Sequence, residues 1–220
     1  MFPAQGLQFL TQLKANNNKI WFQDNKKDYE CFVREPFKQI VTQIVEHLVP
    51  HTHLSPYVKI SEYIFRIYRD VRFTKNKLPF KTFLGAYLDH EGTQSDKPGY
   101  YIHIEPNQSF IACGLYEPKT EQLKKIRQEI VYETEIWQNI LNNPSLQEHW
   151  RNLYPGKCYK KLPKDVAQYP ELASYTTLKQ FLLWKDIPDT IVTSEKYVEY
   201  CVSHFLSAVP FVNFLRNALA

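Results

Sequence analysis

Three short strand-like runs in the middle of the chain constrain its fold more than any other feature. The runs are residues 82–88, 100–105 and 110–115. Each has the length and the aromatic or β-branched content that is typical of a β-strand. Only four residues separate the last two runs, which therefore predict a β-hairpin. Because such short connections join antiparallel strands, the runs predict an antiparallel meander.

Helical periodicity flanks these strands on both sides. Apolar residues recur at a spacing near 3.6 in four ranges, which are 3–15, 24–50, 120–141 and 194–219. Pro36 predicts a kink or a new helix that has this proline in its first turn, and Pro210 predicts a bend. One more strand is predicted near residues 181–184. The sequence thus predicts an α+β fold, with a central antiparallel meander sheet flanked by N-terminal and C-terminal helices, in a single domain over residues 1–220.

A basic segment precedes the first of the three runs. Residues 66–81 carry six basic residues and one acid, a balance of +5. The rest of the chain carries 21 basic and 22 acidic residues, so the net charge of +4 is local to this segment. Alternation over residues 63–73 predicts a half-buried strand here. Arg69 falls on its apolar side, so it is expected either to turn outward at a bulge or to pair with a buried acid.

The polar side of this predicted strand suggests a site for an anionic ligand. Guanidinium groups match phosphate and carboxylate oxygens, and lysines from the following loop would close over the same anion. Tyr101, His103 and Glu105 share one face of a neighbouring strand by the same alternation. His103 is expected to titrate near neutrality and so to carry protons. The candidate ligand-binding residues are Arg66, Tyr68, Arg69, Arg72, Lys77, Lys81 and Tyr101, and the candidate catalytic residues are Asp70, His103 and Glu105.

Two alternatives remain open at this point. The charges can form a structural ion-pair network, with Arg66–Asp70 or Arg72–Glu105 as cross-strand pairs. The protein can also be a non-enzymatic binding protein whose partner is a nucleic acid or another protein, although the near-neutral remainder of the chain makes nucleic acid the weaker choice. The preferred hypothesis is an anionic small molecule as the partner, and whether the chain is an enzyme stays open.

Several other classes of protein lack support in the sequence. His47 and His51 are four residues apart, as in helical zinc sites, but Pro50 lies between them and the glutamate of an HExxH motif is missing, so no metal site is predicted. No glycine-rich phosphate loop or GxSxG motif predicts a cofactor or a serine nucleophile. The four cysteines are scattered without a CxxC pair, which predicts reduced thiols. No apolar run reaches the roughly 18 residues that span a bilayer. No secretory signal is evident, so a cytoplasmic protein without a membrane partner is expected.

The sequence resembles the family called domain of unknown function 2461, which consists of conserved and mostly microbial proteins. The similar segments are NNNKIWFQDNKKDYE (16–30), FRIYRDVRFTKNKLPFK (65–81), PGYYIHIEP (98–106), CGLYEP (113–118), YKKLPK (159–164) and LSAVPFVNFL (206–215). The resemblance implies a compact α+β domain in the cytoplasm and implies no reaction. Two positions depart from the family pattern, with Phe80 where tyrosine is common and Asp165 where glycine is common.

Overall fold

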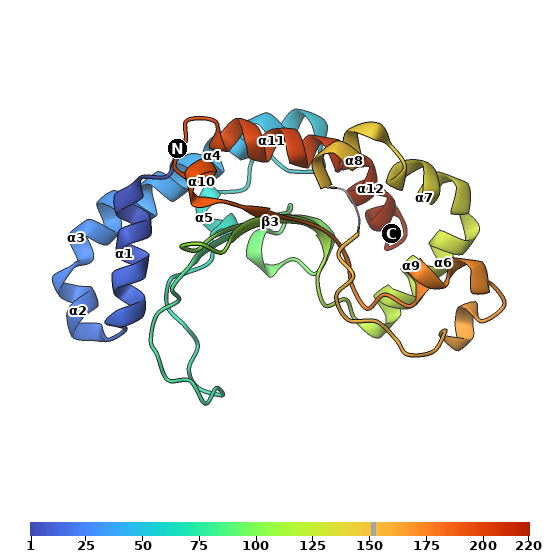
Figure 1. Cartoon of the computed structure of the whole chain (residues 1–220), viewed down its shortest axis with the longest axis horizontal. Coiled ribbons are helices and arrows are strands. Elements are labelled where there is room, and N and C mark those ends of the chain that lie inside the picture. Colours follow the sequence, from blue (N-terminus) through green and yellow to red (C-terminus); the bar gives the residue numbers. More distant parts are fainter. Residues whose placement is uncertain (151–152) are drawn as a thin grey trace. The chain divides into compact units, whose positions relative to one another are not determined.

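A computed structural model of the chain describes residues 1–150 and 153–220 (Figure 1). Its internal contacts group the residues into two compact units. Unit 1 comprises Met1–Gln94, Tyr101–Ile111 and Asp186–Val202, and unit 2 comprises Ser95–Tyr100, Ala112–Lys185 and Ser203–Ala220. The prediction of a single domain is not tested by this grouping and stays a prediction.

The sheet has four strands in the order β1-β2-β3-β4 and is an antiparallel meander, as predicted. The strands are β1 (Leu84–Leu88), β2 (Gly99–Ile104), β3 (Ser109–Leu115) and β4 (Phe181–Ile187). All four lie at the ranges that the sequence indicated. In the β2–β3 hairpin, Asn107 adopts a φ of 61°, a turn conformation that asparagine tolerates better than most residues.

Alternation along the strands separates two faces of the sheet in unit 1. Leu84, Ala86 and Leu88 of β1 are buried on one face, and α4 (Glu35–Leu48) and α5 (Ile60–Tyr63) contact this strand. On β2, Ile102 and Ile104 are fully buried, whereas residues 101 and 103, and residue 105 directly after the strand, alternate to the opposite face. The predicted polar face of β2 therefore exists as expected.

The helices of unit 1 follow the predicted periodicity. They are α1 (Ala4–Ala15), α2 (Lys19–Asp24), α3 (Lys26–Asp28), a π-helix (Tyr29–Arg34), α4, α5 and α10 (Asp189–Val192). The Asn18 side chain caps α2 by accepting a hydrogen bond from the backbone N–H of Trp21 at 3.0 Å. Pro36 lies in the first turn of α4, which continues directly from the π-helix. The apolar face of α4 is buried from Phe37 to Leu48.

Unit 2 consists mainly of helices, and Trp137 is among its buried residues. The helices are α6 (Thr120–Tyr132), α7 (Thr134–Leu141), α8 (Pro144–Trp150), α9 (Ala173–Thr176) and α12 (Val209–Asn217), and α11 (Tyr197–Ser207) has residues in both units. Trp137 is fully buried, with its ring centroid 5.0 Å from that of Phe214 and 5.7 Å from that of Phe211. Aromatic pairs at such separations contribute about 0.5–1.5 kcal/mol beyond their buried area. The C-terminal helix breaks at Ala208, and Pro210 occupies the first turn of α12.

The remaining sequence expectations for the fold concern membranes and cysteines. In the part of the chain that the structure describes, no single helix is long and apolar enough to cross a membrane, although α11 and α12 reach that length and composition together across a 47° bend. All four cysteines are free thiols, as predicted.

The basic segment does not form the predicted strand. Residues 64–83, here called the arm, leave the sheet as a loop whose two extended halves run beside each other (Figure 1, teal). An isolated bridge joins Ile64 to Ala86 of β1, and another joins Tyr68 to Phe80 across the arm. The apolar–polar alternation reflects an extended backbone, but the arm pairs only with itself and the start of β1. The alternation over residues 63–73 would place Phe73 on the buried side of a strand, but this residue is 95% exposed.

Candidate functional site

An open pocket of about 530 Å³ lies at the base of the arm, entirely within unit 1. Its charged and amide side chains come from the arm, from α1 and from the turn after α1, and they are Lys14, Asn17, Arg69, Asp70, Asn76 and Lys81. Three of the four charged groups are cations. The pocket therefore combines a concave shape with a positive balance of charge.

Asn17 fastens the arm beside this pocket. Its side-chain amide donates to the carbonyl oxygen of Phe80 at 3.0 Å and accepts from the N–H of Phe80 at 3.1 Å. The Phe80 ring stacks on Phe22 of α2, with centroids 4.1 Å apart and planes at 17°. Tyr68, a predicted ligand-binding residue, packs near both rings and is 57% exposed. Tyr68 thus helps to hold the arm against α2.

Lys81 and Arg69 are the two arm cations that line the pocket. Lys81 is half-buried, with its Nζ atom 5.0 Å from the Phe65 ring centroid and 5.9 Å from that of Phe83. Burial lowers the pKa of Lys81, and the nearby charge of Arg66 lowers it further. Among the described residues, neither Lys81 nor Arg69 forms an ion pair. Arg69 was expected either to turn outward at a bulge or to pair with a buried acid. In the structure it lines the wall of the pocket.

Asp70 is the acid of the pocket, and Arg72 neutralises it. Arg72 donates from Nε at 3.0 Å, from Nη2 at 2.7 Å and from its backbone N–H at 3.1 Å. These hydrogen bonds lower the pKa of Asp70 to about 2. Both side chains are exposed, so the pair adds little stability. Its main effect is to offset the carboxylate of Asp70, which would otherwise repel an anion in the pocket.

The polar row on β2 meets the pocket through Lys14. Lys14 Nζ lies 3.9 Å from Oε1 of Glu105, and Oε2 of Glu105 lies 3.2 Å from Nε2 of His103. The Tyr101 hydroxyl lies 3.1 Å from the other ring nitrogen, Nδ1. An ionised Glu105 needs a donor, so the neutral ring carries its proton on Nε2 and accepts from Tyr101 at Nδ1. Both ring nitrogens are therefore already engaged.

His103 is enclosed between two phenylalanines, Phe83 at the end of the arm and Phe110 on β3. Its ring stacks on Phe83 and on Phe110, with both centroid distances at 4.5 Å. His103 is only 7% exposed, and this burial lowers its pKa although Glu105 acts in the opposite direction. A buried ring resists protonation, so burial acts against the expected role of His103 as a proton carrier at neutral pH.

A glycine on β1 makes room for Tyr101. A Cβ atom at Gly85 would lie 2.9 Å from the Tyr101 hydroxyl and 3.3 Å from the Phe65 ring. Burial raises the pKa of Tyr101 to about 12, so the phenol stays protonated and remains a donor to His103. The absence of a side chain at residue 85 is thus a condition for the row Tyr101–His103–Glu105.

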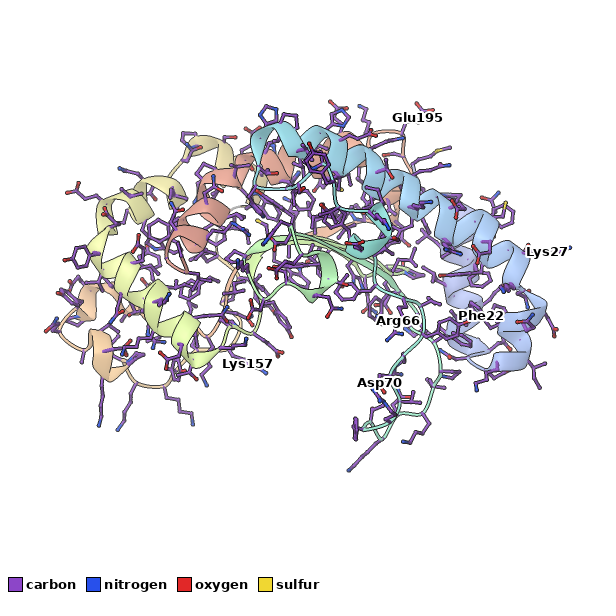
Figure 2. The ribbon with its side chains drawn as sticks, turned by 180° about the vertical axis from the view of Figure 1, so that it is seen from behind. Phe22, Lys27, Arg66, Asp70, Lys157 and Glu195 are labelled. Carbon is purple, nitrogen blue, oxygen red and sulfur yellow. The ribbon has the colours of Figure 1, made fainter. Side chains whose placement is uncertain are left out.

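The structure separates the ten predicted site residues into groups. Arg69, Asp70 and Lys81 line the pocket, whereas Tyr101, His103 and Glu105 form the row on β2. Arg66 is exposed at the sheet end of the arm, and Asp70 lies further along it (Figure 2). Lys77 does not line the pocket, and its ammonium donates to the carbonyl oxygen of Val71 at 2.9 Å, which closes the arm tip.

The predicted cross-strand ion pairs are wrong in their partners. Asp70 binds Arg72 rather than Arg66, and Glu105 contacts Lys14 rather than Arg72. Lys14 and Asn17 were not predicted as site residues. Asn17 belongs to a segment that resembles the family pattern, but nothing in the sequence brings that segment to the arm.

The histidines of residues 47–53 do not build a metal site in the described part of the chain. His53 Nε2 instead lies 2.8 Å from Oδ1 of Asp89, a fully buried carboxylate at the end of β1, and His90 Nδ1 lies 3.2 Å from its other oxygen. These contacts fix the loop after α4 against the sheet.

The fold and this site define an α+β protein with a meander sheet and a basic arm. The chain belongs to the family described as conserved hypothetical protein (DUF2461), whose sequence profile matches residues 5–214. The suspected family resemblance is thereby confirmed. No curated protein and no solved structure gives a significant match to this chain. Of the two departures from the family pattern, Phe80 stacks on Phe22, and Asp165 accepts a hydrogen bond from Arg127 at 3.0 Å.

Proposed function

We propose that unit 1 binds an anionic small molecule, bearing a phosphate or a carboxylate, in the pocket at the base of the arm. The observation that carries this proposal is Lys81, a half-buried cation that has no ion-pair partner among the described residues. Removing a charge from water costs free energy unless a counter-charge offsets it. A bound anion would supply that counter-charge.

The other pocket residues support the same ligand chemistry. Arg69 offers a planar set of N–H donors, and Lys14 offers a mobile ammonium, so an anion can be held from two sides. Asn17 and Asn76 add amide groups to the lining. A volume of about 530 Å³ falls within the range of roughly 300–1,000 Å³ that is common for small-molecule sites.

The alternative interpretation, a structural ion-pair network, accounts for fewer of the basic residues of the arm. Arg72 is the one arm cation that pairs with an acid in the described residues, and its partner is its near neighbour Asp70. A network that existed only for stability would use the other cations as well. Their availability favours a ligand over an ion-pair network as the reason for a basic arm.

Binding is proposed without a chemical step. A general base must reach the proton that it removes, whereas both nitrogens of His103 are occupied and the ring is stacked between phenylalanines. Glu105 reaches the pocket only through Lys14. The catalytic roles of Asp70, His103 and Glu105 therefore remain a separate hypothesis, which needs a proton path that begins at Glu105.

A thermal-shift series tests the proposal. Wild-type protein is heated with inorganic phosphate, sulfate, nucleotides, sugar phosphates and small carboxylic acids, each matched in ionic strength by potassium chloride. A ligand at 100 times its dissociation constant stabilises the folded state by about 2.7 kcal/mol. At least one anion should raise the midpoint of wild type, and Lys81→Gln and Arg69→Gln should each remove most of that rise.

Lys75→Gln is the matched control, because Lys75 is an exposed arm cation that does not line the pocket. It should keep the ligand response of wild type. The proposal fails if no anion stabilises wild type more than potassium chloride does. It also fails if Lys75→Gln loses as much response as Lys81→Gln, since the arm would then attract anions only through its total charge.

A further inference from the structure

A second basic segment belongs to unit 2, whereas the pocket belongs to unit 1. Residues 157–164, here called the lysine loop, contain four lysines and no acid. Together with residues 66–81 it concentrates charges of +4 and +5 in two short segments. The rest of the chain then holds 17 basic and 22 acidic residues, a balance of −5. Such separation of charge within one chain is typical of proteins that bind polyanions.

The lysine loop is held in place by its backbone. The N–H of Tyr159 donates to the carbonyl of Thr177 at 2.8 Å, and the N–H of Lys179 donates to the carbonyl of Lys157 at 2.9 Å. Cys158 and Leu178 form the bridge between these two bonds. The four lysine side chains, Lys157, Lys160, Lys161 and Lys164, are exposed, and none forms an ion pair with a described residue. Figure 2 shows Lys157 at the edge of the ribbon.

The acidic residue next to the lysine loop, Asp165, already has a basic partner. Asp165 follows the loop directly, and it accepts a hydrogen bond from Nε of the buried Arg127 at 3.0 Å. The Tyr159 ring lies between two cations, with Lys179 Nζ at 4.5 Å and Arg127 Cζ at 5.8 Å from its centroid. The loop therefore presents its positive charge without an internal counter-charge.

Exposed aromatic rings accompany these lysines. Tyr154 is three residues before Lys157, is 37% exposed, and stacks on Trp184 with centroids 5.3 Å apart and planes at 27°. Its backbone N–H is fixed to the carbonyl of Leu182 at 2.7 Å. Tyr159 within the loop is 36% exposed. A fixed, half-exposed ring next to lysines is the arrangement on which unpaired bases stack.

We propose that the lysine loop and Tyr154 form a binding surface for single-stranded nucleic acid. The lysines would contact successive phosphates, and the Tyr154 ring would stack on a base. A lipid surface fits less well, because insertion needs free leucine or phenylalanine side chains, whereas the exposed rings beside the loop are stacked or clamped tyrosines. The residues of this surface belong to unit 2, and those of the anion pocket belong to unit 1.

Fluorescence anisotropy of a labelled oligothymidylate of about 20 nucleotides tests the inference over a series of salt concentrations. Wild-type affinity should fall steeply as salt rises, because each phosphate contact releases counterions. In the combined variant Lys157→Gln, Lys160→Gln, Lys161→Gln and Lys164→Gln, the slope of log affinity against log salt should shrink by about 2.8, at roughly 0.7 for each contact. Between about 50 and 200 mM salt, the fall in wild-type affinity should thus exceed that of the variant by about 50-fold.

A matched variant separates this surface from net charge. Lys26, Lys27, Lys38 and Lys59 are exposed lysines of unit 1, and changing all four to glutamine removes the same charge. That control should keep the wild-type slope. Tyr154→Ala should lower affinity on the order of tenfold and leave the slope unchanged, because stacking involves no counterions.

Several results would overturn the inference. One is a lysine-loop variant that matches the control variant in both affinity and slope. Another is equal affinity for a duplex of the same length, since paired bases cannot stack on Tyr154. Binding to phosphatidylserine vesicles without binding to the oligonucleotide would assign the surface to membranes instead. Circular dichroism of each variant confirms that it is folded before its binding is compared.

Discussion

Protonation of His103 should destabilise the folded protein. The ring is 7% exposed, lies between Phe83 and Phe110, and has a lowered pKa because of its burial. The folded chain therefore binds this proton more weakly than the unfolded chain, in which histidine has a pKa of about 6.5. The stability that the neutral ring contributes is present above that value and is lost as the pH falls below it. One such group lowers the free energy of unfolding by at most about 1.4 kcal/mol between pH 7.5 and 5.5.

Urea unfolding at several pH values measures this effect. The free energy of unfolding of wild type is compared with that of His103→Gln, whose side chain does not titrate, and the difference between them isolates one imidazole. His51→Gln is the control for the loss of a histidine, because His51 is exposed and stays in water in both states. As the pH is lowered, the free energy of unfolding of His103→Gln should fall less steeply than that of wild type. Identical pH profiles for wild type and His103→Gln would refute the burial argument.

Two further variants test the arm and the sheet. Arg72→Gln should weaken phosphate binding at the pocket although Arg72 does not line it, because Asp70 would lose its partner and present an uncompensated carboxylate; isothermal titration calorimetry measures the change. Gly114→Ala should lower the free energy of unfolding by about 3 kcal/mol or more, because Gly114 has a φ of 117° and a Cβ atom there would lie 2.1 Å from the carbonyl oxygen of Phe181. A urea midpoint equal to that of wild type would contradict the second expectation.

The sheet and the main helices were predictable because each rests on a local signal. The β2–β3 hairpin follows from two strand-like runs and a four-residue turn, and Pro36 marks the start of α4 by its own geometry. The shared face of Tyr101, His103 and Glu105 also follows from alternation alone. Alternation along a strand does not predict how deeply a side chain such as His103 is buried. The phenylalanines that enclose His103 come from the end of the arm and from β3, and the burial that lowers the pKa of His103 depends on them.

The arm shows where local reasoning fails. Residues 63–73 alternate as a strand does, but a strand also needs a partner, and the arm extends beyond the sheet. The same error placed Phe73 in the core and Arg69 on an apolar face. The pocket was equally out of reach, since it needs the contact of Asn17 with Phe80, which are 63 residues apart. Contacts over such separations depend on how whole elements pack.

The extended backbone of the arm has a consequence for handling the protein. Proteases bind their substrates as extended segments, and exposed loop tips are where they cut first. With six basic residues in 66–81, the arm offers trypsin several bonds in a suitable conformation. After a cut near Lys75, the return half of the arm would stay attached through the two hydrogen bonds between Asn17 and Phe80. Limited digestion would thus yield a nicked chain whose two fragments separate only on denaturation.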